Sequence, residues 1–166
     1  MTNMLPKIQK ILYCTDLSEN SEYACRYALY MACQTGADVY VLYVAEKPSP
    51  DALVTLETYV KDFGGRQKFI EQRLAQAKER LSKQLEHYLE TLPDDQRPGA
   101  ERVKAIHVCE SHPVDEILEQ SERLRCDLIV MGTHRKGMAH TFLGSVSKRV
   151  MSNTRIPVLV VPLPKN

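Results

Sequence analysis

The chain has 166 residues, 43% of them hydrophobic, which fits a single globular domain over residues 1–166 with a sizeable core. Its 22 Lys and Arg against 21 Asp and Glu leave a net charge of +1, so neither a nucleic acid nor an anionic membrane is an expected partner. No apolar run approaches the roughly 20 residues of a membrane span or resembles the core of a signal peptide. Because the five cysteines also lack CxxC spacing, we expect a cytoplasmic protein without disulfides or a structural zinc ion.

Short apolar runs alternate along the chain with amphipathic helical patterns. The runs predict strands at residues 11–13, 39–44, 103–108, 128–131 and 158–161, and the helical patterns cover residues 19–35, 66–91, 113–123 and a segment after Gly144. Asp16 or Ser18 can cap the first helix, and Gly36 ends it. The sequence therefore predicts five strands alternating with four helices.

Two segments lack the regular spacing of apolar residues that indicates a helix or a strand. Residues 46–66 contain Pro48, Pro50 and the pair Gly64 and Gly65, and we expect a flexible excursion over the sheet there. Residues 93–99 are expected to form an irregular segment after the long helix, residues 66–91. The core-facing residues of that long helix are expected to be Ile70, Leu74, Ala77, Leu81, Leu85 and Tyr88.

Strands that alternate with helices specify an open, doubly wound α/β sheet of parallel strands. Such sheets bind ligands beyond the carboxyl ends of their strands, where the strand order reverses. Three segments should meet there: residues 14–16, residues 44–46 and residues 132–147. The candidate ligand site therefore lies where these three segments converge.

The third of these segments has the layout of a phosphate cradle. The apolar run 128–131 ends at Gly132, and Gly144 and Ser145 open the next helical pattern. Helix N-termini attract anions through their unpaired N–H groups and the macrodipole, and glycine lets a phosphate approach the backbone. The alternative is an ordinary strand-turn-helix connection, since Gly-Ser also begins helices that bind no ligand.

Four stretches of the chain together resemble the universal stress protein family: KILYCTDLSENSEYA, MGTHRKG, LGSVSKRV and IPVLVVP. They occur in the family's order and cover nearly the whole chain. The resemblance implies one domain with a five-stranded parallel sheet in the order 3-2-1-4-5, similar to adenine nucleotide-binding folds. Some members of that family bind ATP or AMP, and others bind no nucleotide.

The resemblance also implies a set of contacts to an adenine nucleotide. Asp16 would face the ribose or adenine side, Thr15 would line the pocket, and the backbone of Val44 would contact adenine. Met131 would pack on the base. The phosphates and ribose would be surrounded by Gly132, His134, Gly144, Ser145, Val146 and Ser147. A magnesium ion is expected only if the nucleotide carries it.

The chain departs from the family pattern at the phosphate loop. Arg135 stands where the pattern has a second glycine, and 11 residues separate Gly132 from Gly144, one fewer than the pattern has. Arg135 either blocks a phosphate or binds it through the forked donors of its guanidinium group. These departures bear on the phosphate side of the site more than on the adenine side.

Several candidate residues have structural alternatives. The carboxylate of Asp16 can cap the first helix, and His134 can be an exposed loop residue. Neither His112 nor His140 has a second ligand at metal-binding spacing, so we predict no metal site. Cys109 and His112 lack a third, orienting group, which argues against a nucleophile and base. We predict no catalytic residue.

We weigh three functions. The first is a stress-response protein that binds ATP or AMP with little or no hydrolysis, and the second is a nucleotide-free dimeric adaptor that acts on an unidentified partner protein. A hydrolase using Asp16 and His134 is a third. A homodimer is expected through the last strand, residues 156–162, because an apolar edge strand invites pairing and Pro157 and Pro162 limit further strand addition.

Overall fold

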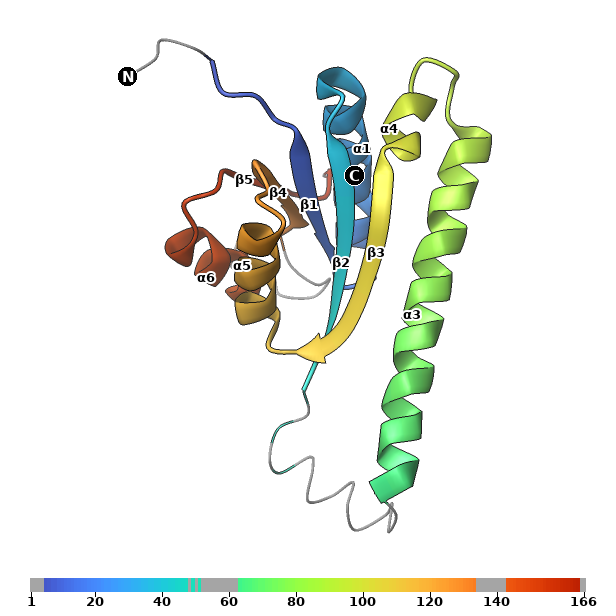
Figure 1. Ribbon diagram of the computed structural model, residues 1–166, viewed down its shortest axis with the longest axis vertical. Helices are drawn as coiled ribbons and strands as arrows, with labels where there is room; N and C mark the ends of the chain where they lie inside the picture. The colour runs from blue at the N-terminus through green and yellow to red at the C-terminus, as the bar shows by residue number, and fades with distance from the viewer. Residues whose placement is uncertain (1–4, 48, 50, 52–62, 134–142, 165–166) are drawn as a thin grey trace.

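The computed structural model describes residues 5–47, 49, 51, 63–133 and 143–164, and within them five parallel strands form one sheet (Figure 1). The strand order is β3-β2-β1-β4-β5, as predicted. The strands are β1 (Lys10–Thr15), β2 (Asp38–Glu46), β3 (Val103–Ser111), β4 (Leu128–Gly132) and β5 (Val158–Val161). The predicted fold class and strand order are therefore confirmed.

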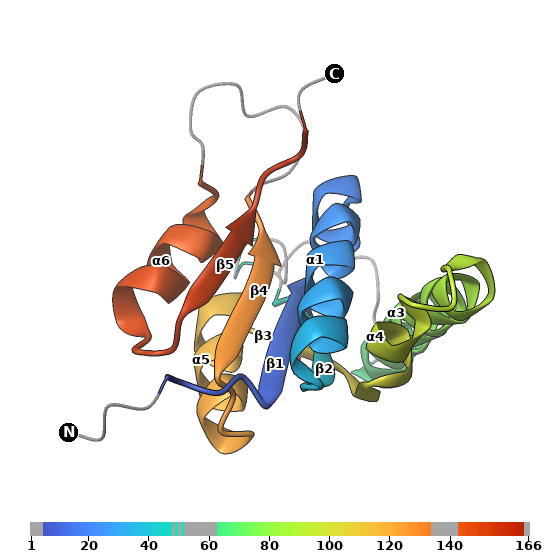
Figure 2. The ribbon, with the colours of Figure 1, turned by 90° about the horizontal axis from the view of Figure 1, so that it is seen from above.

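Helices cover both faces of this sheet (Figure 2). They are α1 (Glu19–Thr35), α3 (Phe63–Thr91), α4 (Arg97–Glu101), α5 (Pro113–Arg123) and α6 (Ser145–Asn153). One face carries α1, α3 and α4, and the other carries α5 and α6. This is the arrangement that right-handed crossovers between parallel strands produce.

Two predictions about the segments before β3 need correction. Helix α3 begins at Phe63, so Gly65 lies in a helix rather than in the expected excursion. Residues 97–101, partly predicted as a break, form the short helix α4, which tolerates Pro98 because the first turn of a helix leaves its N–H groups without intrahelical partners. The rest of the excursion falls mainly on residues 48, 50 and 52–62, outside the described residues.

Each face of the sheet has its own hydrophobic core. On the α1 side, Ala24 and Ala28 are fully buried, and Leu81 of α3 packs into the same cluster. On the other side, Leu12 and Ile129 form part of a smaller cluster beneath α5 and α6. Leu74 is partly buried and packs against the first cluster, as expected, whereas Ile70 is partly buried but is not among the residues that pack there. The helical period therefore predicted most of the buried face of α3.

Candidate functional site

The predicted ligand edge is assembled at the carboxyl ends of the parallel strands. Strand β1 lies between β2 and β4, so the chain crosses back over β1 when it passes from β3 to β4. Cys14 pairs with Met131, which places Thr15 beside Gly132, and Thr15 pairs with Tyr43, the residue before Val44. The structure thus brings Thr15, Val44 and Gly132 together at the point where the strand order reverses, the position at which such sheets bind ligands.

The turn from β1 to α1 is held by its own polar side chains. The Thr15 hydroxyl accepts the Leu17 N–H at 3.0 Å and pairs with the Ser21 hydroxyl at 3.0 Å. The Asp16 carboxylate accepts the Ser18 N–H at 3.0 Å, and Ser18, not Asp16, is the N-cap residue of α1. Thr15 is buried, whereas Asp16 is exposed. Of these two predicted site residues, only Asp16 presents its side chain to solvent.

Leu17 in this turn adopts a left-handed backbone conformation, with φ of 63°. A non-glycine residue in this region is uncommon and costs on the order of 1 kcal/mol or more. Its N–H is held by Thr15, and its carbonyl accepts the Arg80 guanidinium of α3 at 3.2 Å. The turn is therefore fixed from both β1 and α3.

Gly132 is needed where the end of β4 passes the first turn of α1. A Cβ atom at this position would lie 3.2 Å from the backbone carbon and oxygen of Asn20 and from the backbone nitrogen of Ser21. The buried Asn20 amide donates to the Thr133 hydroxyl at 2.8 Å and ties α1 to the segment after β4. Gly132 thus has a packing role whether or not a phosphate approaches it.

The N-terminus of α6 is anchored to the end of β4. The Gly144 N–H donates to the Thr133 carbonyl, and the buried Ser147 hydroxyl donates to the Gly132 carbonyl at 3.0 Å. Gly144 is the N-cap residue, with extended backbone angles, and Ser145 is exposed in the first turn. The first-turn amides of Ser145, Val146 and Ser147 lack partners within the helix, as in every α-helix, and therefore favour an anion at this end.

Two predicted contacts also have a structural role. The Met131 side chain is 5% exposed and packs in the cluster beneath α5 and α6. The Ser147 hydroxyl is directed at the backbone after β4. Val44 is partly buried against the same cluster as Met131, and His134 and Arg135 lie outside the described residues.

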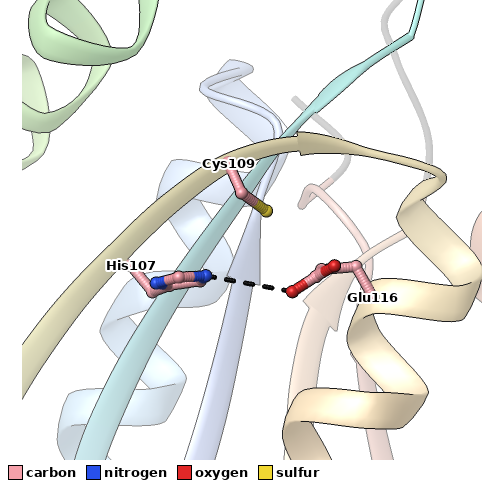
Figure 3. Close-up of side chains that lie close together, drawn as sticks. All are labelled: His107, Cys109 and Glu116. Carbon is pink, nitrogen blue, oxygen red and sulfur yellow. Dashed lines mark ion pairs between the residues drawn. The ribbon is translucent and has the colours of Figure 1, made fainter.

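Sequence reasoning missed Asn20 and Thr133, which link α1 to β4, and it missed a second group of side chains at β3. His107 and Cys109 project from one face of β3, and Glu116 faces them from α5 (Figure 3). Their nitrogen, sulfur and oxygen atoms all lie within 4.8 Å of one another. The available signal was the two-residue spacing of His107, in the predicted strand 103–108, and Cys109, one residue after it, because residues two apart in a strand share a face.

The pairing of Cys109 with His112 that the sequence suggested is not part of this group. His112 is the exposed N-cap residue of α5. Burial raises the pKa of the Cys109 thiol to about 11, with a further contribution from the charge of Glu116. A raised pKa favours the protonated thiol, which is less nucleophilic than the thiolate.

A concavity of about 470 Å³ lies at the other end of α1, away from the carboxyl edge. It is lined by Arg26, Tyr30 and Cys33 of α1 and by residues near the end of α3, including His87. The Cys33 thiol donates to the Asp95 carbonyl at 3.3 Å across one side of it. Among the predicted nucleotide contacts that the structure describes, none is one of its lining residues.

The strand order, the crossover at β1 and the anchored N-terminus of α6 define a doubly wound α/β protein with the ligand-edge geometry of that class. Residues 7–162 match the sequence pattern of the universal stress protein family. The chain therefore belongs to the universal stress protein family.

Curated relatives and solved structures agree with this assignment. Universal stress protein MJ0531 of Methanocaldococcus jannaschii is 34% identical over 160 residues, covering 95% of this chain and 84% of the relative. The solved structure of hypothetical protein MJ0577 has the same fold, with a TM-score of 0.73 at 23% identity, covering 97% of this chain and all of that one. A universal stress protein solved in complex with cAMP has a TM-score of 0.57 at 20% identity, covering 94% of this chain and 98% of that one.

Among the described residues, no helix combines the length and the apolar character that crossing a bilayer requires.

Proposed function

We propose that this chain is a cytoplasmic stress-response protein that binds an adenine nucleotide, ATP or AMP, and hydrolyses it slowly or not at all. The observation that carries the proposal is the anchoring of α6: bonds from Gly144 and Ser147 to the backbone after β4 hold the helix N-terminus at the crossover edge. An N-terminus fixed in this position is a preformed site for an anion. The cAMP complex of a protein with this fold supports an adenine nucleotide as the ligand.

The described residues fit such a ligand mainly through the backbone. The first-turn amides of α6 and the exposed hydroxyl of Ser145 would hold the phosphates, and Asp16 would face the ribose. The backbone of Val44 would lie beside adenine, two strands away from β4. Because the hydroxyls of Thr15 and Ser147 are already engaged within the protein, they would shape the site rather than bind the ligand. A magnesium ion would arrive only with the nucleotide.

Native mass spectrometry of the freshly purified protein, followed by calorimetry with ATP, AMP and GTP, tests this proposal. We expect a bound adenine nucleotide or binding of ATP or AMP in preference to GTP. Gly144→Val should weaken ATP binding at least tenfold, because its branched side chain lies where a phosphate would approach the amides. Unchanged affinity in a folded Gly144→Val protein would remove this helix from the site.

Asp16→Ala tests whether Asp16 lies near the ribose or near the phosphates of the proposed ligand. If Asp16 faces the ribose, the variant should lose affinity for adenosine and ATP by similar factors. A loss confined to ATP would place Asp16 near the phosphates instead and would contradict its assigned position.

Arg135 would either bind a phosphate or block its approach, and two substitutions distinguish these alternatives. If its guanidinium binds the phosphate, Arg135→Ala should lower ATP affinity, and the loss should shrink at high salt as the contact is screened. If its side chain blocks the phosphate, Arg135→Gly should improve binding. Calorimetry at two salt concentrations distinguishes the two signs.

The proposed homodimer forms through β5. This strand lies at the edge of the sheet, and Ile129 donates its N–H to the Pro157 carbonyl. Because backbone groups alternate along a parallel ladder, those of Leu159 point back to β4, and those of Val158 and Val160 point outward. A second β5 pairing antiparallel would use these outward groups around a twofold axis.

Proline substitutions test this pairing without charged residues in the core. Val160→Pro removes an outward N–H and some side-chain packing but no backbone bond to β4, so it should abolish the dimer and leave the sheet folded. Leu159→Pro, the matched control, removes a bond to β4 and should destabilise the fold itself. Light scattering that shows a wild-type monomer, or a Val160→Pro dimer of unchanged affinity, would overturn the proposed interface.

A nucleotide-free dimeric adaptor for a partner protein is the second candidate. Arg135 in place of glycine and the internal use of the Thr15 and Ser147 hydroxyls favour it. It predicts no nucleotide in the purified protein and no ATP binding by calorimetry. A turnover assay with ATP addresses hydrolysis separately.

A further inference from the structure

Three metal-ligating side chains meet where β3 and α5 face each other. His107 and Cys109 are two residues apart on β3, so they project from the same face of the strand. Glu116 lies in the first turn of α5, the helix that follows β3 and packs against that face. Figure 3 shows the three side chains converging on one space between the strand and the helix.

The separations fit a single small ion. The Nε2 atom of His107 lies 3.8 Å from the Oε1 atom of Glu116, and the Sγ atom of Cys109 completes a group within 4.8 Å. Zinc bonds of about 2.0 Å to nitrogen and oxygen and about 2.3 Å to sulfur place tetrahedral ligands roughly 3.3 to 3.7 Å apart. The histidine and carboxylate are already close to that spacing, and a small side-chain rotation brings in the thiol.

The carboxylate is held in place by a chain of hydrogen bonds along α5. The Gln120 amide donates to Oε1 of Glu116 at 2.8 Å, and the Arg123 guanidinium donates to the Gln120 carbonyl oxygen. Gln120 is itself buried. Outer partners of this kind orient a ligand and reduce the entropy lost when a metal binds.

The group is open to solvent on one side. Strand β3 is the edge strand of the sheet, and the His107 side chain is 48% exposed, whereas Glu116 is 14% exposed. A metal ion can therefore enter from the edge and retain a water molecule as its fourth ligand. Three protein ligands plus water is the arrangement of open zinc sites.

We propose that His107, Cys109 and Glu116 form a binding site for a borderline-soft divalent cation, with Zn²⁺ as the favoured ion. The sulfur and imidazole ligands select against Mg²⁺ and Ca²⁺, which prefer oxygen. The site is built from side chains of β3 and α5, whereas the proposed nucleotide edge uses β1, β2, β4 and α6. The two sites meet where Val44 of β2 pairs with Cys109 of β3, but they share no residue. Metal binding without nucleotide therefore tests this site separately.

Metal binding at this site must release a proton. The ion replaces the thiol proton of Cys109, forms a metal–sulfur bond and sends the proton to solvent, while Glu116 binds as a carboxylate and His107 as a neutral imidazole. Metal affinity should therefore rise with pH, because protons compete with the ion for the ligand atoms.

Titration with Co²⁺ alone, without nucleotide, tests the site directly. Co²⁺ occupies zinc sites and gives a thiolate charge-transfer absorption only when sulfur is a ligand. We expect one equivalent of Co²⁺ to produce this absorption and one equivalent of Zn²⁺ to abolish it. Calorimetry with Zn²⁺ in buffers of different protonation enthalpy should report about one proton released per ion.

Matched variants assign the ligands. Cys109→Ser should remove the charge-transfer absorption, and Glu116→Gln should weaken Zn²⁺ binding at least tenfold, on the order of the losses seen even for outer-shell changes. Cys33→Ser and Glu119→Gln, the latter on the same helix, are the controls and should bind as wild type. Gly144→Val should also bind Zn²⁺ normally, whatever its effect on ATP.

Three results would overturn the proposal: no saturable Co²⁺ or Zn²⁺ binding, binding without the sulfur absorption, or equal affinity in Cys109→Ser and wild type. Circular dichroism and thermal melting of the metal-free variants establish that each is folded. If Cys109→Ser fails to fold, Cys109→Ala and His107→Ala provide the same test, since His107 is largely exposed.

Discussion

The carboxyl ends of β4 and β3 lie on the same edge of the sheet, but they offer different kinds of chemistry. At β4, the polar side chains of Thr15, Asn20 and Ser147 bond to neighbouring groups of the protein and fix the backbone. At β3, the atoms of His107 and Cys109 converge on Glu116. In the proposed sites, the end of β4 would contact a ligand mainly through the backbone, and the end of β3 would contact one through side chains.

This difference predicts where substitutions act. At the β4 corner, a side-chain change disturbs the packing of α1 and α6 against the sheet, so its main effect is on stability. At the β3 corner, the side chains are partly exposed and carry little of the core, so their main effect is on binding and reactivity. The following substitutions test the contrast.

Gly132→Ala should have the largest effect on stability. Its added Cβ would lie 3.2 Å from backbone atoms of Asn20 and Ser21, and backbone cannot move aside as a flexible side chain can. We expect a loss of about 1–3 kcal/mol in the free energy of unfolding, measured with urea. Gly65→Ala in α3 should be neutral or stabilising, since a helix favours alanine.

Cys109→Ser is the corresponding change at the β3 corner, and it should cost less than about 1 kcal/mol in metal-free protein. If Cys109→Ser destabilised the protein as much as Gly132→Ala, the contrast between a structural corner and a ligand corner would be wrong.

Loss of the hydrogen bond between Asn20 and Thr133 should have the next largest effect on the free energy of unfolding. Asn20→Ala and Thr133→Val each remove one partner of a buried hydrogen bond of 2.8 Å, so each should cost about 1–2 kcal/mol. The double variant should show a coupling energy of at least about 0.5 kcal/mol by urea unfolding. Asn153→Ala is the control, because its bond to Arg149 is exposed. Additive losses would mean that the bond does not link α1 to β4.

Alanine substitutions at Ser145 and Ser147, in the same turn of α6, should have opposite effects on stability and on ATP affinity. Ser147→Ala should cost about 1 kcal/mol in stability, because the buried hydroxyl bonds to the Gly132 carbonyl, and should leave ATP affinity within about twofold. Ser145→Ala should do the reverse, lowering ATP affinity about 3- to 10-fold with stability nearly unchanged. Urea unfolding and calorimetry of both variants check the pair, and an exchange of the two outcomes would contradict the assigned contacts.

The sequence predicted the central strands β1, β2 and β4 well because they are mostly buried and consist largely of apolar residues. It placed β5 and α5 within their observed bounds. It missed α4, since Pro98 and Gly99 read as breakers although proline is tolerated in a first helical turn. Local propensity thus failed where a short helix is stabilised by packing, as Ala100 is buried against the α1 side of the sheet.

The candidate site was predictable only in part, for a related reason. Glycines and helix starts mark backbone-built sites in the sequence, so the edge around Gly132 and Gly144 was found. The sequence could not tell that the Ser147 hydroxyl points inward and the Ser145 hydroxyl outward, because helix rotation is set by packing. Glu116 was missed because its contact with His107 depends on how α5 lies across β3.

The smallest predicted effect concerns the reactivity of Cys109 without metal. Burial and then the charge of Glu116 raise the pKa of this thiol to about 11, so Glu116→Gln should lower the pKa and increase the thiolate fraction below pH 11. Each unit by which the pKa falls raises that fraction about tenfold, and it lowers the reactivity of the thiolate itself by only about threefold.

The alkylation rate of Cys109 at pH 9 should therefore rise modestly. It can be followed by mass spectrometry of the Cys109 peptide in a Cys33→Ser background. Cys126 reports on the same sample as an internal control, because burial, and then the charges of Lys10 and Asp127, shift its pKa, and Glu116 does not. An unchanged Cys109 rate, or an equal increase at Cys126, would show that the Glu116 carboxylate does not act on the thiol.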